Sequence, residues 1–192
     1  MIGGKVDRFR ALGYDERMDH KKFEQLLALF LIFIGVVVRL LPHGDNFAPL
    51  TALALFSGAV VSPGAALSVP VLAIMASDLW IGPHDLFWLV WGCFLLTVGI
   101  GFWVKKNPGA LNIVLGTFAG SVLFFILTNL GVFLFENMYP KSFSGLVECY
   151  AMALPFFRNS LAGDFFYAVV FFGSYNLALR FVCHSRESGN QI

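Results

Sequence analysis

Residues 111–135, LNIVLGTFAGSVLFFILTNLGVFLF, form an apolar stretch without a single Lys, Arg, Asp or Glu. A helix that crosses a bilayer needs about 20 consecutive, mostly apolar residues, so this stretch is long enough to span one. An Asn side chain that faced lipid would leave hydrogen-bonding groups unpaired, and Asn129 is therefore expected to point into the protein. Its partner there is either another helix or a ligand.

The composition extends this reading to the whole chain. Hydrophobic residues make up 58% of the sequence and charged residues only 13%, and 22 residues are Phe. The mean hydropathy is +0.75. Soluble domains carry about 25% charged residues, so the chain is expected to be an integral membrane protein rather than a soluble one.

Six hydrophobic stretches divide the chain. They are Leu26–Leu41, Pro49–Val61, Ala65–Ile81, Phe87–Val104, Leu111–Phe135 and Ser160–Cys183. Only short connections fit between them, which predicts an all-α membrane protein with six transmembrane helices in one compact bundle over residues 23–183. The polar ends, 1–22 and 184–192, lack an apolar period and are expected to be a disordered cytoplasmic arm and a disordered tail.

The distribution of basic residues predicts the orientation, because Lys and Arg gather on the cytoplasmic side of membrane proteins. With six spans and a cytoplasmic N-terminus, ten of the thirteen Lys and Arg residues lie inside, and only Arg39, Lys141 and Arg158 lie outside or in the outer half. Both termini are then cytoplasmic, in a bacterial inner membrane. The stretch Pro49–Val61 is short enough to be re-entrant instead, but five spans would place Lys105 and Lys106 outside.

The long connection before the last span differs from the other connections. Its segment Leu146–Phe157 is apolar and aromatic but too short to span, so a short helix lying over the outer mouth is expected there. Within the spans, Gly116 with Gly120 and Ala54 with Gly58 form small-xxx-small pairs, which predict close packing between helices of the same chain.

Under this topology, the polar residues gather at the outer end. The segment Arg39–Pro49 offers a cation, an imidazole, a carboxylate and an amide, on backbone that Pro and Gly keep out of regular helix. Irregular backbone at membrane depth is tolerated where protein buries it or where it lines a cavity. Arg39, His43 and Asn46 are therefore candidate ligand-binding residues. Alternatively, Arg39 extends its head group to the interface, and Asp45 and Asn46 cap the next helix.

Two further segments carry polar groups at the same level. An ionised Asp78 is costly there unless it is paired or hydrated, so it is expected to pair with Arg39, to contact a ligand, or both. Arg158, Asn159 and Asp164 open the last span. Asn159 or Ser160 is a suitable N-cap, and Asp164 suits the positive end of the helix dipole; a ligand-binding role for Arg158, Asn159 and Asp164 is the alternative.

Enzyme and metal motifs are absent from the sequence. It contains no HExxH, no GxSxG and no phosphate-binding Gly-Lys-Ser/Thr loop. Cys93, Cys149 and Cys183 are scattered without a CxxC, and two short His/Asp pairs on separate loops do not define a metal site. No cofactor, metal ion or nucleic-acid partner is predicted.

Several motifs between Arg39 and Gly173 resemble an uncharacterised bacterial membrane family. They include Arg39-Leu-Leu-Pro-His-x-x-Asn-Phe-x-Pro, Ser77-Asp78-Leu, Thr128-Asn129-Leu-Gly-Val, Cys149-Tyr150, Pro155-Phe-Phe-Arg-Asn159 and Gly163-Asp164. Members of that family are similar in size and six-helix layout to the substrate-binding S components of energy-coupling-factor (ECF) vitamin transporters. The resemblance adds Tyr150 to the candidate ligand-binding residues.

The resemblance implies a protein that binds a small, vitamin-like molecule from the outer side during uptake, and a transporter energising module as a partner beside the lipid bilayer. The first span departs from S components because Ala28 has no alanine partner four residues away, and such a pair marks the docking face. Solitary function or a different partner therefore stays open. The alternatives are an intramembrane enzyme at the outer leaflet, with Asp78, Asp164 or His43 as acid or base, and a structural membrane subunit.

Overall fold

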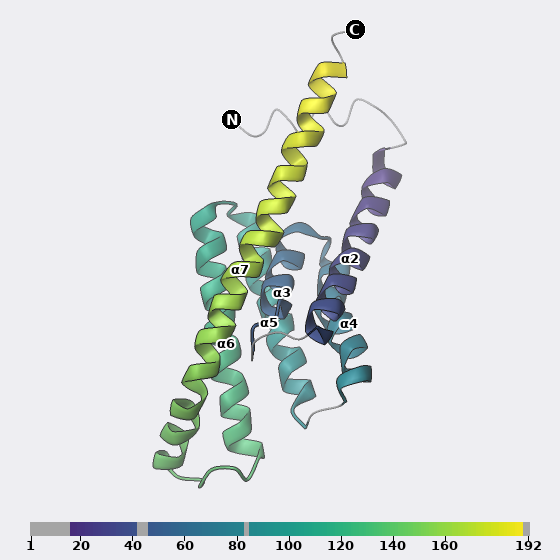
Figure 1. The fold of residues 1–192 in the computed structure, drawn as a ribbon. Helices are drawn as coiled ribbons and strands as arrows, with labels where there is room; N and C mark the ends of the chain where they lie inside the picture. The colour runs from purple at the N-terminus through teal and green to yellow at the C-terminus, as the bar shows by residue number, and fades with distance from the viewer. Residues whose placement is uncertain (1–15, 42–45, 83–84, 190–192) are drawn as a thin grey trace.

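The computed structural model describes residues 16–41, 46–82 and 85–189, and the regular structure in these residues is entirely helical. It comprises six helices: α2 (Glu16–Leu40), α3 (Leu50–Val60), α4 (Pro63–Ile81), α5 (Phe87–Lys106), α6 (Ala110–Phe135) and α7 (Phe143–Gly189). Successive helices alternate in direction, so α2 begins and α7 ends at the upper end of Figure 1. Helix α2 begins within the predicted arm 1–22, and α7 continues into the predicted tail 184–192.

Helix α3 lies at the centre of the bundle. It contacts each of the other five helices, and its residues from Leu50 to Gly58 are all buried. Its 11 residues extend over only about 16 Å at 1.5 Å per residue. Since the hydrocarbon core of a bilayer is about 30 Å thick, α3 is half the length that a full crossing requires.

Small residues bring α3 and α5 into direct backbone contact. A Cβ atom added to Gly58 would collide with the carbonyl oxygen of Val98, and one added to Gly101 would collide with that of Leu55. In α6, Gly116 and Gly120 face side chains of α3 and α5 in the same way. The predicted close packing within one chain is therefore confirmed for both small-xxx-small pairs.

Aromatic side chains of α7 pack against Phe56 of α3. Phe56 of α3 is 2% exposed, and its ring centroid lies 5.7 Å from that of Phe171, 5.0 Å from that of Phe172 and 5.7 Å from that of Tyr175. Aromatic pairs at such separations contribute about 0.5–1.5 kcal/mol each beyond the apolar area that they bury. This cluster holds α7 alongside the central helix.

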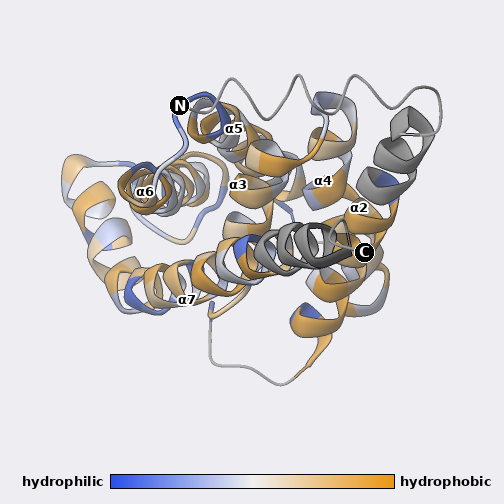
Figure 2. Cartoon of the chain, turned by 90° about the horizontal axis from the view of Figure 1, so that it is seen from above, coloured by the Kyte–Doolittle hydropathy of each residue, from blue (hydrophilic) through white to orange (hydrophobic). Residues whose placement is uncertain are grey.

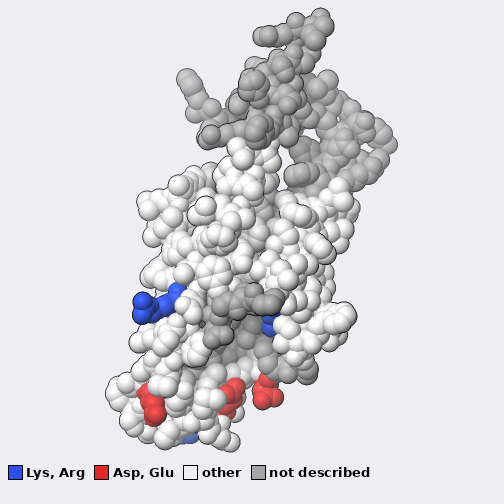
Figure 3. Space-filling view, in the orientation of Figure 1, with Lys and Arg blue, Asp and Glu red and all other residues white. Residues whose placement is uncertain are grey.

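Apolar side chains cover the outside of the bundle. Helices α4, α5 and α6 are long and apolar enough to cross a membrane, and large side chains such as Phe33, Leu79 and Phe118 are exposed. Figure 2 shows that hydrophobic residues make up most of the described helices, with a smaller number of hydrophilic residues among them. In Figure 3 most of the described surface is uncharged, and Asp and Glu side chains gather at the lower end. A continuous apolar surface of this extent indicates contact with lipid.

The segment before the last predicted span differs from the prediction. We expected a separate short helix over Leu146–Phe157, but this segment is the first part of α7, a single helix of 47 residues that contains Pro155. Proline removes one backbone hydrogen bond and bends a helix without having to end it. Figure 2 shows the first turns of α7 running in a different direction from the rest. Asn159 and Ser160 lie inside α7, so the predicted N-cap there is wrong.

Candidate functional site

The first turn of α3 begins inside the protein and has no cap of its own. The residue before it is Pro49, which makes no side-chain capping hydrogen bond. The first backbone N–H groups of a helix have no partner within that helix. Asp164 of α7, which is 2% exposed, lies close enough to the Thr51 hydroxyl and the Ala52 backbone N–H to interact with both. A carboxyl group from one helix thus lies at the N-terminus of another.

A third helix completes this arrangement. The Ser121 hydroxyl of α6 lies 2.7 Å from Oδ2 of Asp164, to which it donates. The Asp164 carboxyl therefore joins α3, α6 and α7 at one buried point. At the opposite end of α3, the Lys105 ammonium of α5 donates to the carbonyl oxygen of Val61 at 2.9 Å. An acid at the N-terminus and a base at the C-terminus both match the dipole of α3.

A cavity of about 200 Å³ opens beside Asp164. It lies between α6, α7 and the connection from α2 to α3. The residues that line it are Asn46, Ser121, Phe124, Phe125, Thr128, Asn129, Ala153, Phe156, Phe157, Ser160 and Asp164. Aromatic walls with a few convergent polar groups are typical of small-molecule sites.

The connection that closes one side of the cavity is held by Gly163 and Phe47. A Cβ atom at Gly163 would lie 3.2 Å from Cα of Phe47, so glycine lets the connection approach α7 closely. The Phe47 ring then lies 5.8 Å from the ring of Phe166 and 5.7 Å from that of Tyr167. Beside it, Asn46 has a φ of 60°, a left-handed conformation that Asn adopts more readily than most residues. This packing fixes Asn46 at the cavity.

Three of the sequence-predicted site residues, Asn46, Asn129 and Asp164, are brought together in this cavity. The Asn129 side chain donates from Nδ2 to the carbonyl oxygen of Phe125 in its own helix, at 2.8 Å. Within the described residues, its amide shows no hydrogen bond to another helix. The Asn129 side chain thus lines a cavity and does not form a hydrogen bond between two of the described helices.

Arg39 and Asp78 form a separate constellation between α2 and α4. Nη1 of Arg39 lies 2.7 Å from Oδ1 of Asp78, and the two side chains are 16% and 13% exposed. The same nitrogen donates to Oγ of Ser77 at 2.6 Å. The predicted ion pair is confirmed, and neither residue lines the cavity beside Asp164.

The remaining predicted site residues lie elsewhere. Tyr150 donates its hydroxyl to the carbonyl oxygen of Ile126 at 2.7 Å, which ties the start of α7 to α6. Arg158 and Asn159 are exposed on α7 and do not line the cavity. His43 falls in 42–45, outside the described residues.

Sequence reasoning missed Thr51 and Ser121 as partners of Asp164, and the Phe side chains that wall the cavity. Thr117, Ser121 and Thr128 follow one another at helical spacing in an apolar stretch, which is a signal for one polar face. No comparable signal marks the Phe residues, because the chain contains 22 of them.

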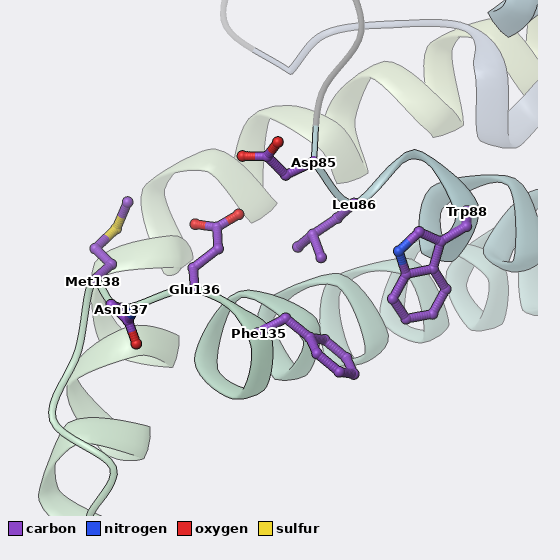
Figure 4. Close-up of a pocket in the computed structure, with 7 residues that line it drawn as sticks. All are labelled: Asp85, Leu86, Trp88, Phe135, Glu136, Asn137 and Met138. Atoms are coloured by element: carbon purple, nitrogen blue, oxygen red, sulfur yellow. The ribbon is translucent and has the colours of Figure 1, made fainter.

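A second hollow of about 600 Å³ lies at the lower end of the molecule, where α5 begins and α6 ends. Figure 4 shows the Asp85 and Glu136 carboxylates there, with the rings of Trp88 and Phe135 beside them. Most of its lining residues are exposed, and solvated charges contribute little to binding. The smaller cavity, with its buried carboxyl group, is the better candidate site.

An all-helical fold with three helices able to cross a bilayer indicates a membrane protein, here with a polar cavity between its helices. Residues 20–186 match a family described as a family of unknown function, DUF6580, and the chain belongs to this family. This agrees with the resemblance to an uncharacterised family. Comparison with curated proteins and with solved structures gave no match.

The Arg39–Asp78 pair should be energetically coupled. Because both groups are largely buried, Arg39→Leu or Asp78→Asn should each lower the free energy of unfolding by about 3 kcal/mol. The double change should cost less than the sum, by about 1 kcal/mol or more. Unfolding in detergent measures the cycle, and Arg158→Leu on the exposed face is the matched control, expected within about 0.5 kcal/mol of the unchanged chain. Simple additivity would show that the two residues are not partners.

Proposed function

We propose that this protein is an integral membrane protein that binds a small organic molecule between its helices as a step in uptake, like the S components of ECF vitamin transporters. The observation that carries the proposal is the 200 Å³ cavity with Asp164 at its edge. Aromatic side chains supply apolar contact, while amide, hydroxyl and carboxyl groups converge on the same space. Such a combination can hold and orient a polar ring compound.

The size of the cavity limits the ligand. Sites for drug-sized molecules measure about 300–1,000 Å³, whereas this cavity measures about 200 Å³. A compound of one substituted ring is the best fit, smaller than most vitamins with two ring systems. The ligand is vitamin-like in chemistry and at the small end of that class.

The proposed topology has six crossings, cytoplasmic termini and a location in the bacterial inner membrane. It is supported by the alternation of helix direction in Figure 1 and by the positions of the basic residues. Lys105 and Lys106 end α5, and cytoplasmic loops favour such residues. The lower end of the bundle, with its Asp and Glu side chains, then faces outward. Because α3 is short, its crossing is completed by the connections on either side of it.

Reporter fusions test this topology. A reporter that is active only in the cytoplasm should be active when fused after Lys106 and inactive when fused after Asp85, because helix α5 separates the two positions. Fluorescence or enzyme activity in whole cells, normalised to the amount of fusion protein, gives the measurement. Activity after Asp85 would contradict the six-crossing arrangement.

The energising partner is a separate part of the proposal. Ala28 is buried in α2, and α2 contacts only α4 and α3 among the described helices. The outward face of α2 therefore remains open to a neighbouring subunit or to lipid. We include an ATPase module as a candidate partner on the basis of the S-component resemblance.

A cavity-filling substitution tests whether the cavity binds a ligand. Ala153 lines the cavity, and Ala151 lies two residues away on the exposed face of α7. Ala153→Phe should occupy the space that the ligand needs, while Ala151→Phe adds the same side chain outside it. Mass spectrometry of small molecules retained by the purified proteins should find a compound with the unchanged chain and with Ala151→Phe, and not with Ala153→Phe.

Two results would contradict the binding proposal. One is a retained compound whose amount is the same in Ala153→Phe as in the unchanged chain. The other is the absence of any retained compound when the protein is purified rapidly from cells grown in rich medium. Equal melting temperatures of the two variants would establish that loss of the compound is not loss of the fold.

A further inference from the structure

We infer that the ligand of this cavity is a small planar cation that presents several N–H donors, such as an amidinium or a protonated amino-substituted ring. The inference rests on the proposed function, since it names the chemical class that the cavity beside Asp164 accepts. It follows from the hydroxyl acceptors of α6, the carboxyl group of Asp164 and the aromatic rings that line the cavity.

The hydroxyl groups of α6 have no hydrogen left for a ligand. Oγ1 of Thr128 donates to the carbonyl oxygen of Phe124 at 2.7 Å. Oγ of Ser121 donates its single hydrogen to Asp164, at the shorter distance of 2.7 Å, and lies 3.0 Å from the carbonyl oxygen of Thr117. A hydroxyl group has one donor hydrogen and two acceptor lone pairs. Thr128 and Ser121 therefore face the cavity as acceptors.

Asn129 and Asp164 add acceptor capacity to the same wall. Nδ2 of Asn129 donates one of its two hydrogens to Phe125 within α6, which leaves one N–H and the carbonyl oxygen of the amide as further hydrogen-bonding groups. The carboxyl group of Asp164 has more than one acceptor site, and the one hydrogen bond to it with a stated distance comes from Ser121, at 2.7 Å. Acceptor capacity of Asp164 therefore remains for the ligand.

The charges and rings of the lining point to the same class. Asp164 is the single ionisable residue among those that line the cavity in the described part of the chain, and no Lys, Arg or His joins it. Phe124, Phe125, Phe156 and Phe157 provide the walls, and the rings of Phe125 and Phe157 lie 4.5 Å apart. Aromatic faces attract cations and stack on flat rings. An anionic ligand would meet no complementary charge among these residues.

Three probes of nearly identical shape separate the possibilities: benzamidinium, benzamide and benzoate. They carry a positive charge, no charge and a negative charge on the same flat frame. Calorimetric titration of the full chain in nanodiscs should find benzamidinium bound about tenfold more tightly than benzamide, because a hydrogen bond to a charged group is about twice as strong as a neutral one. Benzoate should not bind measurably.

Two variants assign the effect to the cavity. Asp164→Asn keeps one acceptor oxygen for α3 and should abolish the preference for benzamidinium over benzamide. Thr128→Val removes a cavity acceptor without touching α3 and should weaken benzamidinium about fivefold. Thr97→Val is the matched control, because Thr97 also donates to its own helix, at Cys93, but does not line the cavity.

If benzamide or benzoate binds more tightly than benzamidinium, and Ala153→Phe abolishes that binding, the ligand is not a cation. The proposed binding function would still be supported by this result. Failure of all three probes to bind would also overturn the class, while the retained-compound experiment decides the proposed function separately. Benzamidinium binding that Thr128→Val leaves unchanged would place the probe outside this cavity and overturn the inference.

Discussion

A short helix that begins inside the protein is the constraint on which the rest of the structure depends. The first residues of α3 are buried, and each buried N–H group left without a partner costs about 1–3 kcal/mol. Asp164 from α7 supplies the acceptor at one end, and Lys105 from α5 supplies the donor at the other. Helices α5 and α7 are thereby positioned against α3 by two ionisable side chains.

The candidate site follows from this constraint. Because Asp164 must reach the first turn of α3, α7 passes close to the connection that precedes α3, and Gly163 permits that approach. Beside this contact, the cavity lies between α6 and α7. A carboxyl group at the first turn of α3 thus also provides the one ionisable group among the described residues that line the cavity. Substitution of Asp164 is therefore expected to change both ligand binding and the stability of the fold. Substitution of Thr128, which borders the cavity without contacting α3, is expected to change binding alone.

Local sequence shows where the apolar segments lie and where Pro and Gly end them, so most of the helices could be predicted. It also shows how deep each polar residue lies along its segment, and this depth predicted the Arg39–Asp78 pair. Asn46, Asn129 and Asp164 were also selected correctly as residues of one region. The partners of Asp164 could not be predicted from local sequence. Ser121 lies 43 positions away in the chain, and the depth of a residue in the membrane does not show which helices are in contact. The continuity of α7 was missed because Leu146–Phe157 was judged by its length alone and Asn159 or Ser160 was interpreted as the N-cap of a new helix. Pro155 lies inside α7, where a proline often only bends the helix.

Amide hydrogen exchange of α3 tests the capping arrangement most directly. In nanodiscs, the backbone N–H groups from Leu50 to Val60 should be among the slowest to exchange in the unchanged chain. In Asp164→Leu, which offers no acceptor, the amides of the first turn should exchange at least about tenfold faster, while Asp164→Asn should show a smaller effect and α5 should serve as the internal reference. Unchanged protection of the α3 first turn in Asp164→Leu would contradict the account.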